Sequence, residues 1–575
     1  MLRRALAVAV AVPLAAAAAA SAQTAIPEGP DAAGLERYRG AAVTPQPFEA
    51  PAVPRHPHMA PNGRSNLHED AYQTDTVAPD RLAPLGDGTR RTASNLFVQE
   101  CASVTFDSRG RIVTVCVGLV QATLRILDPV TLRELAALPL PLRDPLAGTG
   151  NPFTSFGGGG YFYLDQHDRA VVPTADRHLR IVRALDPPAL QEDADIPLTA
   201  VVDQGDSVLS ALPDFHGRIW FATARGVVGT VDPATGAVRA TRTGEGIGNS
   251  FAVDRDGSVS IVTDAALYRF EAEGDGTPRA VWRLPYANTG TVKSGQTQPG
   301  SGTTPTLIGD DLVAITDNAD PIAVVVAQRG RQAQGERVIC RQPVFEPGAS
   351  STDQSLIAAG RTIVVENNHG YSIAATQGGG STTPGLARVD LDEDGRGCRV
   401  VWTSAERAPS AVPKLALGTG LVYTWTKDPN PEGEDGWYLT AIDVRTGRTR
   451  WEALGGEGLG HNNNYAPITV APDGSIVVGV LGGIVRLADA RPPQLSPAPT
   501  VRRAALLRLR CLSGGRVRAS VASAGVRRAT FRAGRRAVTR RRAPFAATLP
   551  RAARVSVRVL RRSGAERRAS RAPRC

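Results

Sequence analysis

The chain has 575 residues with 59 Gly, 43 Pro and only 5% aromatic residues, so short strands joined by turns are expected and a protein of long helices is excluded. Its formal net charge of +11 is unevenly distributed, because residues 501–575 hold 23 Arg against the single acid Glu566, which leaves −11 for the rest of the chain. An acidic body with a basic tail is predicted, and such a tail favours anionic partners, although a high Arg content also follows from GC-rich codon usage alone.

Residues 1–22 are predicted to be a secretory signal peptide. Arg3 and Arg4 precede an apolar run, and Ala20-Ser21-Ala22 has the A-x-A pattern of a cleavage site. A membrane anchor retained in the mature protein is the alternative, but the run is rich in Ala and short for a span. No later stretch is apolar enough to cross a bilayer, so the protein is expected outside the cell or on the exterior of its envelope.

Residues 23–67 form a Pro-rich N-terminal arm without periodicity, which we interpret as a tether or as an arm lying on the surface. His56, His58 and His68 lie in or beside this arm. Solvated loop histidines are the favoured interpretation, and a metal site is the alternative.

A repeat dominates residues 68–489. A short apolar strand, a turn rich in Asp and Gly, and a second strand of β-branched character recur eight times. The second strands are predicted at residues 112–115, 170–173, 219–222, 259–262, 312–315, 362–365, 421–424 and 476–479. The spacing of roughly 40 to 60 residues is typical of four-stranded blades, so an all-β fold with an eight-bladed β-propeller is predicted.

The eighth repeat stops at Asp489 before its outer strands are complete. An open ring would leave an unpaired sheet edge, so an N-terminal strand is expected to close it. The segment Glu69–Leu85 is predicted to supply the missing strand.

The segment from Trp437 to Trp451, WYLTAIDVRTGRTRW, resembles the repeat of pyrroloquinoline-quinone-type propellers, in which a strand ending in Leu-Asp precedes a Thr-Gly turn and a strand ending in Trp. Residues 123–137 and 227–241 resemble the same repeat more weakly. This resemblance implies a quinoprotein-like propeller over residues 69–489. It does not imply one activity, since such families contain quinone dehydrogenases as well as non-catalytic assembly and binding proteins.

After a Pro-rich linker at residues 490–500, residues 501–575 alternate apolar and polar positions. This period-two pattern predicts a small Arg-rich β-sandwich-like module with Arg on its solvent-facing surface. A disordered Arg-rich tail is the alternative.

Six cysteines behind a secretion signal predict disulfides. If Ser108-Arg109 is the centre of a two-residue turn, Cys101 and Cys116 lie directly opposite each other on one hairpin. The complete prediction pairs Cys101 with Cys116, Cys340 with Cys398, and Cys511 with Cys575.

Propeller geometry gathers one set of loops at the mouth of the central channel. The loops that lead into first strands, and those that join second to third strands, hold most of the unusual polar residues of this chain and so predict a ligand site there. The candidate ligand-binding residues are Glu100, Asn249, Asp317, Asn318, Glu366, Asn367, His369, His461, Asn462, Asn463, Asn464 and Tyr465. Turn capping by Asn and Asp is the structural alternative for each of them.

A secreted binding or scaffold propeller, without an assigned catalytic residue and expected to be a monomer, is the favoured function. Its expected partners are a small molecule or protein at the mouth and an anionic cell-surface polymer at the tail. A hydrolase or lyase that works with His, Glu or a bound metal is one alternative, and a quinone-dependent dehydrogenase is another. Asp317, Asp320 and Glu366 offer oxygens suited to calcium. For pyrroloquinoline quinone, the resemblance implies two adjacent cysteines, and no two cysteines are adjacent here.

Overall fold

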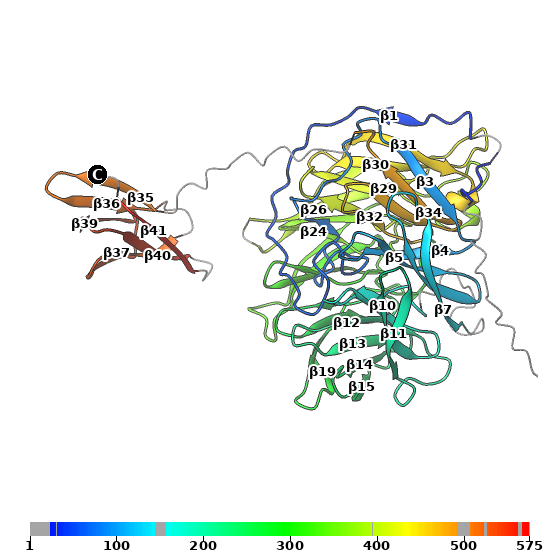
Figure 1. The fold of residues 1–575 in the computed structure, drawn as a ribbon, viewed down its shortest axis with the longest axis horizontal. Helices are drawn as coiled ribbons and strands as arrows, with labels where there is room; N and C mark the ends of the chain where they lie inside the picture. The colour runs from blue at the N-terminus through cyan, green and yellow to red at the C-terminus, as the bar shows by residue number, and fades with distance from the viewer. Residues whose placement is uncertain are drawn as a thin grey trace, which may run out of the picture. The chain divides into compact units, whose positions relative to one another are not determined.

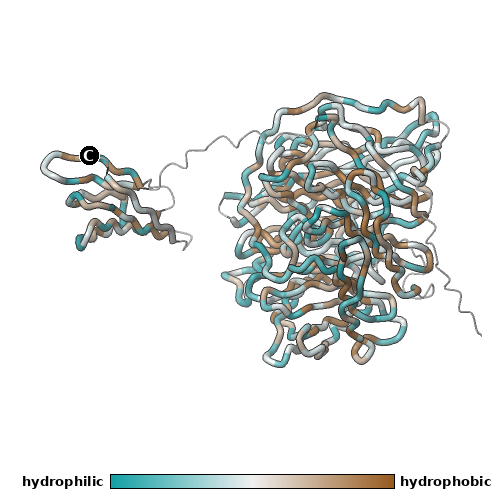
Figure 2. Tube along the Cα trace, in the orientation of Figure 1, coloured by the Kyte–Doolittle hydropathy of each residue, from teal (hydrophilic) through white to brown (hydrophobic). Residues whose placement is uncertain are grey.

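The computed structural model describes residues 24–29, 32–143, 157–393, 395–491, 507–521, 526–561 and 566–573. The chain divides into two compact units, Met1–Pro493 and Gln494–Cys575 (Figure 1). Hydropathy alternates along the tube of the first unit, as expected for strands that each bury part of their surface (Figure 2).

The first unit is an eight-bladed β-propeller. Six of its blades are sheets of four consecutive antiparallel strands. In chain order these are β4 (Glu100–Phe106), β5 (Ile112–Val117), β6 (Gln121–Leu127) and β7 (Glu134–Leu142); β8 (Tyr163–Leu164), β9 (Arg169–Pro173), β10 (His178–Ala184) and β11 (Leu190–Pro197); β12 (Val208–Pro213), β13 (Ile219–Thr223), β14 (Val227–Val231) and β15 (Val238–Arg242); β16 (Ala252–Val253), β17 (Val259–Val262), β18 (Ala266–Ala272) and β19 (Pro278–Pro285); β20 (Thr306–Ile308), β21 (Leu312–Thr316), β22 (Ala323–Gln328) and β23 (Val338–Pro343); and β24 (Ile357–Ala359), β25 (Thr362–Glu366), β26 (Leu386–Leu391) and β27 (Cys398–Ser404).

The seventh and eighth blades take strands from the N-terminal region. The seventh contains β28 (Lys414–Ala416), β29 (Leu421–Thr426), β30 (Gly436–Asp443) and β31 (Thr449–Glu457), with β1 (Tyr38–Gly40) added at the β31 edge and β2 (Thr76–Val77) at the β28 edge. The eighth contains β32 (Ile468–Val470), β33 (Ile476–Val480) and β34 (Gly483–Ala488), and β3 (Arg90–Leu96) is its outer strand. The two 3₁₀ helices of the described residues are η1 (Ala374–Thr376) and η2 (Leu459–His461).

All eight predicted second strands are present, as β5, β9, β13, β17, β21, β25, β29 and β33. These inner strands are almost wholly buried because they lie between neighbouring blades, whereas outer strands such as β11 and β15 are largely exposed. The hairpins that lead into several second strands begin with Asp. Asp107 accepts hydrogen bonds from the backbone N–H groups of Arg109 (3.0 Å) and Arg111 (2.9 Å), which fixes the tight turn.

An N-terminal strand closes the ring, as predicted, but it is not the predicted one. Strand β3 pairs with β34 from Arg90 opposite Ala488 to Leu96 opposite Gly483, so the assignment of Glu69–Leu85 to the eighth blade was wrong. The outermost strand of a blade is half-exposed and needs no apolar run, so the sequence RRTASNL gives little pattern from which a strand could be predicted.

Residues 60–77, which we call the channel segment, instead fill the centre of the propeller. Their backbone hydrogen-bonds to the innermost strands of the second, fourth, fifth, sixth and seventh blades in turn. These bonds run from Leu164 N–H to Ser65 O (2.8 Å), Val253 N–H to Ala71 O (2.9 Å), Leu307 N–H to Tyr72 O (2.9 Å), Ala358 N–H to Thr74 O (3.0 Å) and Leu415 N–H to Asp75 O (3.0 Å). The channel is therefore occupied by the protein's own chain.

The arm before this segment lies against the propeller and is not a free tether. Phe48 hydrogen-bonds to Leu417 O through its backbone N–H (2.8 Å). His56 packs against Phe215, with 4.2 Å between ring centroids, and its burial lowers its pKa to about 3. His68 is also buried, so the prediction of solvated histidines was wrong for both residues. In the sequence these two histidines lie outside any predicted strand. They are buried only because the propeller blades pack around them.

Two of the predicted disulfides are confirmed. Cys101 and Cys116 are bonded and lie directly opposite each other on β4 and β5. Cys340 on β23 and Cys398 on β27 join the outer strands of the fifth and sixth blades. Cys511 is disulfide-bonded, and its predicted partner, Cys575, lies outside the described residues, as does the predicted signal peptide.

The second unit is a two-sheet β-sandwich, as predicted. One sheet has the order β35-β36-β39 and the other β38-β37-β40-β41. The strands are β35 (Arg508–Leu512), β36 (Arg516–Ser520), β37 (Val526–Ala533), β38 (Arg536–Arg540), β39 (Ala546–Pro550), β40 (Val555–Arg561) and β41 (Glu566–Arg571). Phe531, Leu549 and Val557 belong to a core formed by the inward-facing positions of both sheets. Among the described residues of the chain, no helix is long and apolar enough to span a membrane.

Candidate functional site

Buried polar side chains from several blades meet at the channel mouth. Leading loops of several blades converge there above the channel segment. They enclose a cavity of about 20 Å³, lined by Leu67, His68, Ala102, Gly160, Tyr161, Asn249, Asp353, Gln354, Ser355, Val412, Tyr465 and Pro467. A cavity of this size has room for about one water molecule, so the mouth is closed over its contents.

Asp353 is the most distinctive residue on this cavity. Its Oδ2 accepts hydrogen bonds from the hydroxyl (2.8 Å) and the backbone N–H (3.2 Å) of Thr297, whereas its buried Oδ1 has no hydrogen-bond partner among the described residues. Burial raises the pKa of Asp353 to about 7. An unpartnered buried carboxyl oxygen beside a cavity is a strong acceptor for a ligand that brings its own donor.

Glu100 lies close to this cavity at the start of β4. Its Oε2 accepts a hydrogen bond from the side-chain amide of Asn464 (2.8 Å), and its Oε1 is a second buried acceptor without a partner in the described part of the chain. Burial raises the pKa of Glu100 to about 8. The mouth therefore contains two carboxyl groups that change protonation state near neutral pH.

The loop of three asparagines that follows η2 is held at the mouth by aromatic residues. The hydroxyl of Tyr371 lies 3.0 Å from Oδ1 of both Asn462 and Asn464, and the hydroxyl of Tyr465 donates to Gly295 O (3.2 Å). Asn463 donates to Ala466 O (2.7 Å) within the loop itself. Two long loops, which contain Gly295 and Tyr371, thus cover the mouth.

The floor of the cavity is formed by the channel segment. His68 Nδ1 lies 3.0 Å from Asp75 Oδ2, and Ser355 Oγ lies 3.1 Å from Nδ1 and 3.2 Å from Nε2 of the same ring. Lys414, which is fully buried, pairs with Asp75 and donates to Leu67 O (2.6 Å). The lysine and histidine lower the pKa of Asp75 against the effect of burial, so Asp75 is a carboxylate in the folded protein.

The predicted residues divide into three groups. Glu100, Asn249, Asn462, Asn463, Asn464 and Tyr465 lie at the mouth. Glu366 and Asn367 do not line the cavity: Glu366 accepts a hydrogen bond from Asn368 (2.8 Å), and Asn367 donates to Ala349 O (2.9 Å) in the neighbouring loop. The remaining four predicted residues contact other parts of the same face.

Asp317, Asn318, His369 and His461 make up that last group. Asp317 pairs with Arg341, Asn318 donates to Asn288 Oδ1 (3.0 Å), and His369 contacts Thr383 (3.0 Å). His461 contacts Glu457 O (2.8 Å), and burial lowers its pKa to about 4, so it acts as a neutral anchor of the η2 loop.

The described residues do not fit the two cofactors suggested by the sequence. No group of three His, Cys, Asp or Glu side chains in the described ranges is arranged to hold a metal ion. Asp317 and Asp320 make separate contacts, to Arg341 and to Gly348 N–H (2.7 Å). A quinone of three fused rings needs a pocket of roughly 300 Å³ or more, far larger than the cavity at the mouth.

The candidates predicted from the sequence do not include Asp353, nor three other residues that line this cavity, Tyr161, Ser355 and His68. Tyr161, whose hydroxyl donates to Asn249 Oδ1 (3.0 Å), directly follows a run of glycines at residues 157–160. Asp353 and Ser355 lie in the same polar loop. His68 was assigned to solvent, although the unusually polar run NLHED around it was a signal that this part of the arm needs buried partners.

Comparison with known proteins leaves the activity open. No protein-family model matches the chain. A curated relative from Archaeoglobus fulgidus, itself an uncharacterized protein, is 29% identical over 325 residues. The match covers 50% of this chain and 62% of the relative, so the chain spans less than two thirds of the relative's length.

Solved structures with a similar fold are more distant in sequence. BamB from Moraxella catarrhalis matches with a TM-score of 0.40 and 13% identity over 72% of this chain and 94% of BamB. The computationally designed protein Ika8 matches with a TM-score of 0.40 and 13% identity over 71% of this chain and 99% of Ika8.

Proposed function

We propose that this protein is a secreted binding or scaffold propeller that recognises a small polar molecule at its channel mouth. The observation that carries the proposal is the buried Oδ1 of Asp353, which lines the cavity and lacks a partner among the described residues. A carboxyl group with a pKa of about 7 accepts a hydrogen bond well from an ammonium or hydroxyl group. The cavity admits a group of that size, and the rest of the ligand would displace the covering loops.

A thermal-shift screen of the full chain against amino acids, polyamines and monosaccharides tests this function. We expect one class to raise the melting temperature, because a ligand that binds only the folded state stabilises it by mass action. Asp353→Asn is expected to weaken that ligand about tenfold, the effect of losing a charge-assisted hydrogen bond. Asp310→Asn, which changes an exposed carboxyl group, is the control.

If no compound of the panel shifts the melting temperature, or if Asp353→Asn binds as tightly as the native chain, the mouth has only a structural role. The scaffold function would then have to reside on another surface of the propeller.

One observation favours a hydrolase as the second candidate. His68 contacts both Ser355, which lines the cavity with it, and Asp75, and a hydroxyl, an imidazole and a carboxylate are the groups of a nucleophilic triad. The imidazole would accept the Ser355 proton while Asp75 stabilises its charged form. The same contacts also anchor the channel segment, so an experiment must separate the two roles.

Labelling with a fluorophosphonate, which reacts with activated serines, makes that separation. A hydrolase predicts covalent labelling of the native chain and its complete loss in Ser355→Ala, with the melting temperature of the variant close to native. Unlabelled native protein, or labelling that persists in Ser355→Ala, would leave Ser355 as a structural residue.

A further inference from the structure

The solvent-facing side of the sheet β38-β37-β40-β41 carries a patch of arginines and hydroxyls, which we call the arginine face. On β37, Arg528, Thr530 and Arg532 point outward between the buried Ala529, Phe531 and Ala533. On β40, Ser556, Arg558 and Leu560 alternate in the same way with buried valines. Strand pairing sets Arg528 opposite Leu560, Thr530 opposite Arg558, and Arg532 opposite Ser556, which itself faces Ser570 on β41.

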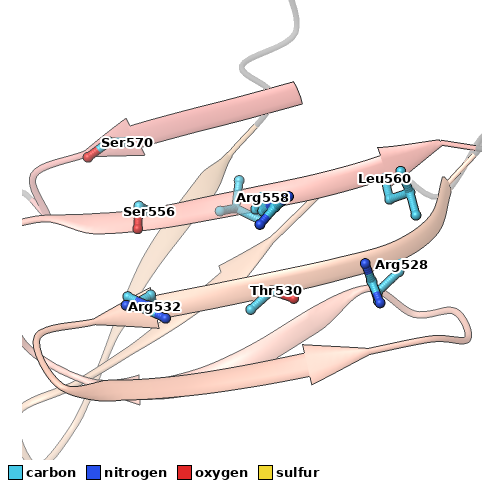
Figure 3. A pocket seen from close by; sticks show the side chains of 8 residues that line it. Arg528, Thr530, Arg532, Ser556, Arg558, Leu560 and Ser570 are labelled. Atoms are coloured by element: carbon cyan, nitrogen blue, oxygen red, sulfur yellow. The ribbon is translucent and has the colours of Figure 1, made fainter. Parts of the chain in front are cut away.

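These side chains surround an open groove of about 660 Å³ (Figure 3). Arg528 and Arg532 lie at its two ends on β37, and Arg558 lies between them on the neighbouring strand (Figure 3). Neither Arg528 nor Arg532 has an ion pair or a side-chain hydrogen bond to the described residues, and both are exposed. Their guanidinium N–H groups are therefore available to donate hydrogen bonds to a ligand in the groove.

A concentration of like charges on one sheet face is unfavourable without an external anion, because Arg558 lies diagonally across from both Arg528 and Arg532 and like charges at such positions repel one another. The region contains 23 Arg and one acid, so the unit itself has almost no carboxylate to neutralise the groove. The planar fork of Arg matches the oxygens of a phosphate, and Ser and Thr hydroxyls donate to the same oxygens. The chemistry of the groove therefore matches phosphate.

The absence of exposed aromatic side chains narrows the choice of polyanion. The two aromatic residues in 501–575, Phe531 and Phe545, are both buried. The face consequently has no platform on which nucleic-acid bases or sugar rings would stack. Along β37, charged and hydroxyl side chains alternate every second residue, about 7 Å apart, which suits a chain in which phosphates alternate with hydroxylated linkers.

We propose that the arginine face binds a linear polyol-phosphate polymer. The phosphates would lie on Arg528, Arg558 and Arg532, and the polyol segments would lie on Thr530, Ser556 and Ser570. This site is independent of the channel mouth, since all its residues belong to the second unit.

Binding of fluorescently labelled poly(glycerol phosphate) to the full chain tests the proposal. We expect Arg528→Ser/Arg532→Ser/Arg558→Ser to weaken binding by about tenfold or more, and to make the dependence of log Kd on log salt shallower, because fewer counterions are released. The matched control removes three exposed arginines from the outer side of the other sheet, Arg510, Arg516 and Arg518, and has the same net charge. It should change the affinity by less than about threefold.

Equal weakening by the two triple variants would overturn the proposal, because affinity would then follow total charge. Tighter binding of double-stranded DNA or inorganic polyphosphate, at equal phosphate content, would overturn the choice of polymer. Arg528→Lys/Arg532→Lys/Arg558→Lys keeps the charge and removes the bidentate fork. It should bind with intermediate affinity, and native-like affinity of this variant would contradict recognition by guanidinium groups.

Discussion

Lys414→Met is expected to destabilise the protein by about 3–5 kcal/mol, because it leaves the buried carboxylate of Asp75 without its cation. Lys414 and Asp75 are both fully buried, and they join the seventh blade to the channel segment. The same lysine also donates to Leu67 O (2.6 Å), so its loss frees two acceptors at the centre of the propeller. Urea denaturation of the full chain measures the change in the free energy of unfolding.

The role of this pair in fixing the channel segment has a separate readout. Amide hydrogen exchange of residues 68–77 should accelerate in Lys414→Met more than exchange in the outer strands. Asp75→Asn/Lys414→Met should recover part of the lost stability, since neither charge remains. Arg255→Met, which removes a partner of the exposed Arg255–Asp310 pair, should cost less than about 1 kcal/mol. A cost that small for Lys414→Met would contradict the anchoring role.

Glu100→Gln is expected to change how stability depends on pH. In the folded chain the pKa of Glu100 is raised to about 8, from an ordinary value of 4.5, so the folded state keeps a proton that the unfolded state has lost between these pH values. Stability from this group is therefore complete below pH 4.5 and falls by about 1.4 kcal/mol per pH unit until about pH 8. Gln mimics the protonated form, so the variant should be more stable than the native chain at pH 8.

The difference between native and variant chains from pH 7 to pH 8 isolates this effect, because Glu366, whose pKa burial also raises, contributes to both chains alike. Asp70 and Asp353, whose pKa values are raised to about 7, also lower the stability of the folded chain as the pH rises, but mainly below pH 7. Burial lowers the pKa of His56 to about 3 and that of His461 to about 4. These two histidines make stability rise with pH, but only below their ordinary pKa of 6.5. Melting temperatures of native and variant chains across this interval measure the difference.

Glu336→Gln, which makes the same change at an exposed position, is the control and should leave the native pH profile unchanged. If Glu100→Gln shows the native profile as well, Glu100 is ionised in the folded protein and must have a cationic partner at the mouth.

The candidate site was only partly predictable. Asn and Asp in leading loops indicated the mouth, and Glu100, Asn249 and Tyr465 do lie there. Asp317 and His461 are polar residues in equivalent loops and were predicted on the same grounds. In the structure Asp317 pairs with Arg341, and His461 contacts the backbone of Glu457. A loop pattern gives the face on which a side chain lies, whereas its distance from the axis depends on how each loop folds.

The repeat is predictable from local sequence. Period-two apolar strands, Asp-rich turns and their spacing are local properties, so all eight second strands and the opposition of Cys101 and Cys116 followed from them. The segment that fills the channel and the strand that closes the ring depend on long-range contacts instead. Residues 60–77 have no periodicity because their hydrogen-bond partners are contributed by five different blades, and β3 is recognisable only by the edge of β34 that it covers.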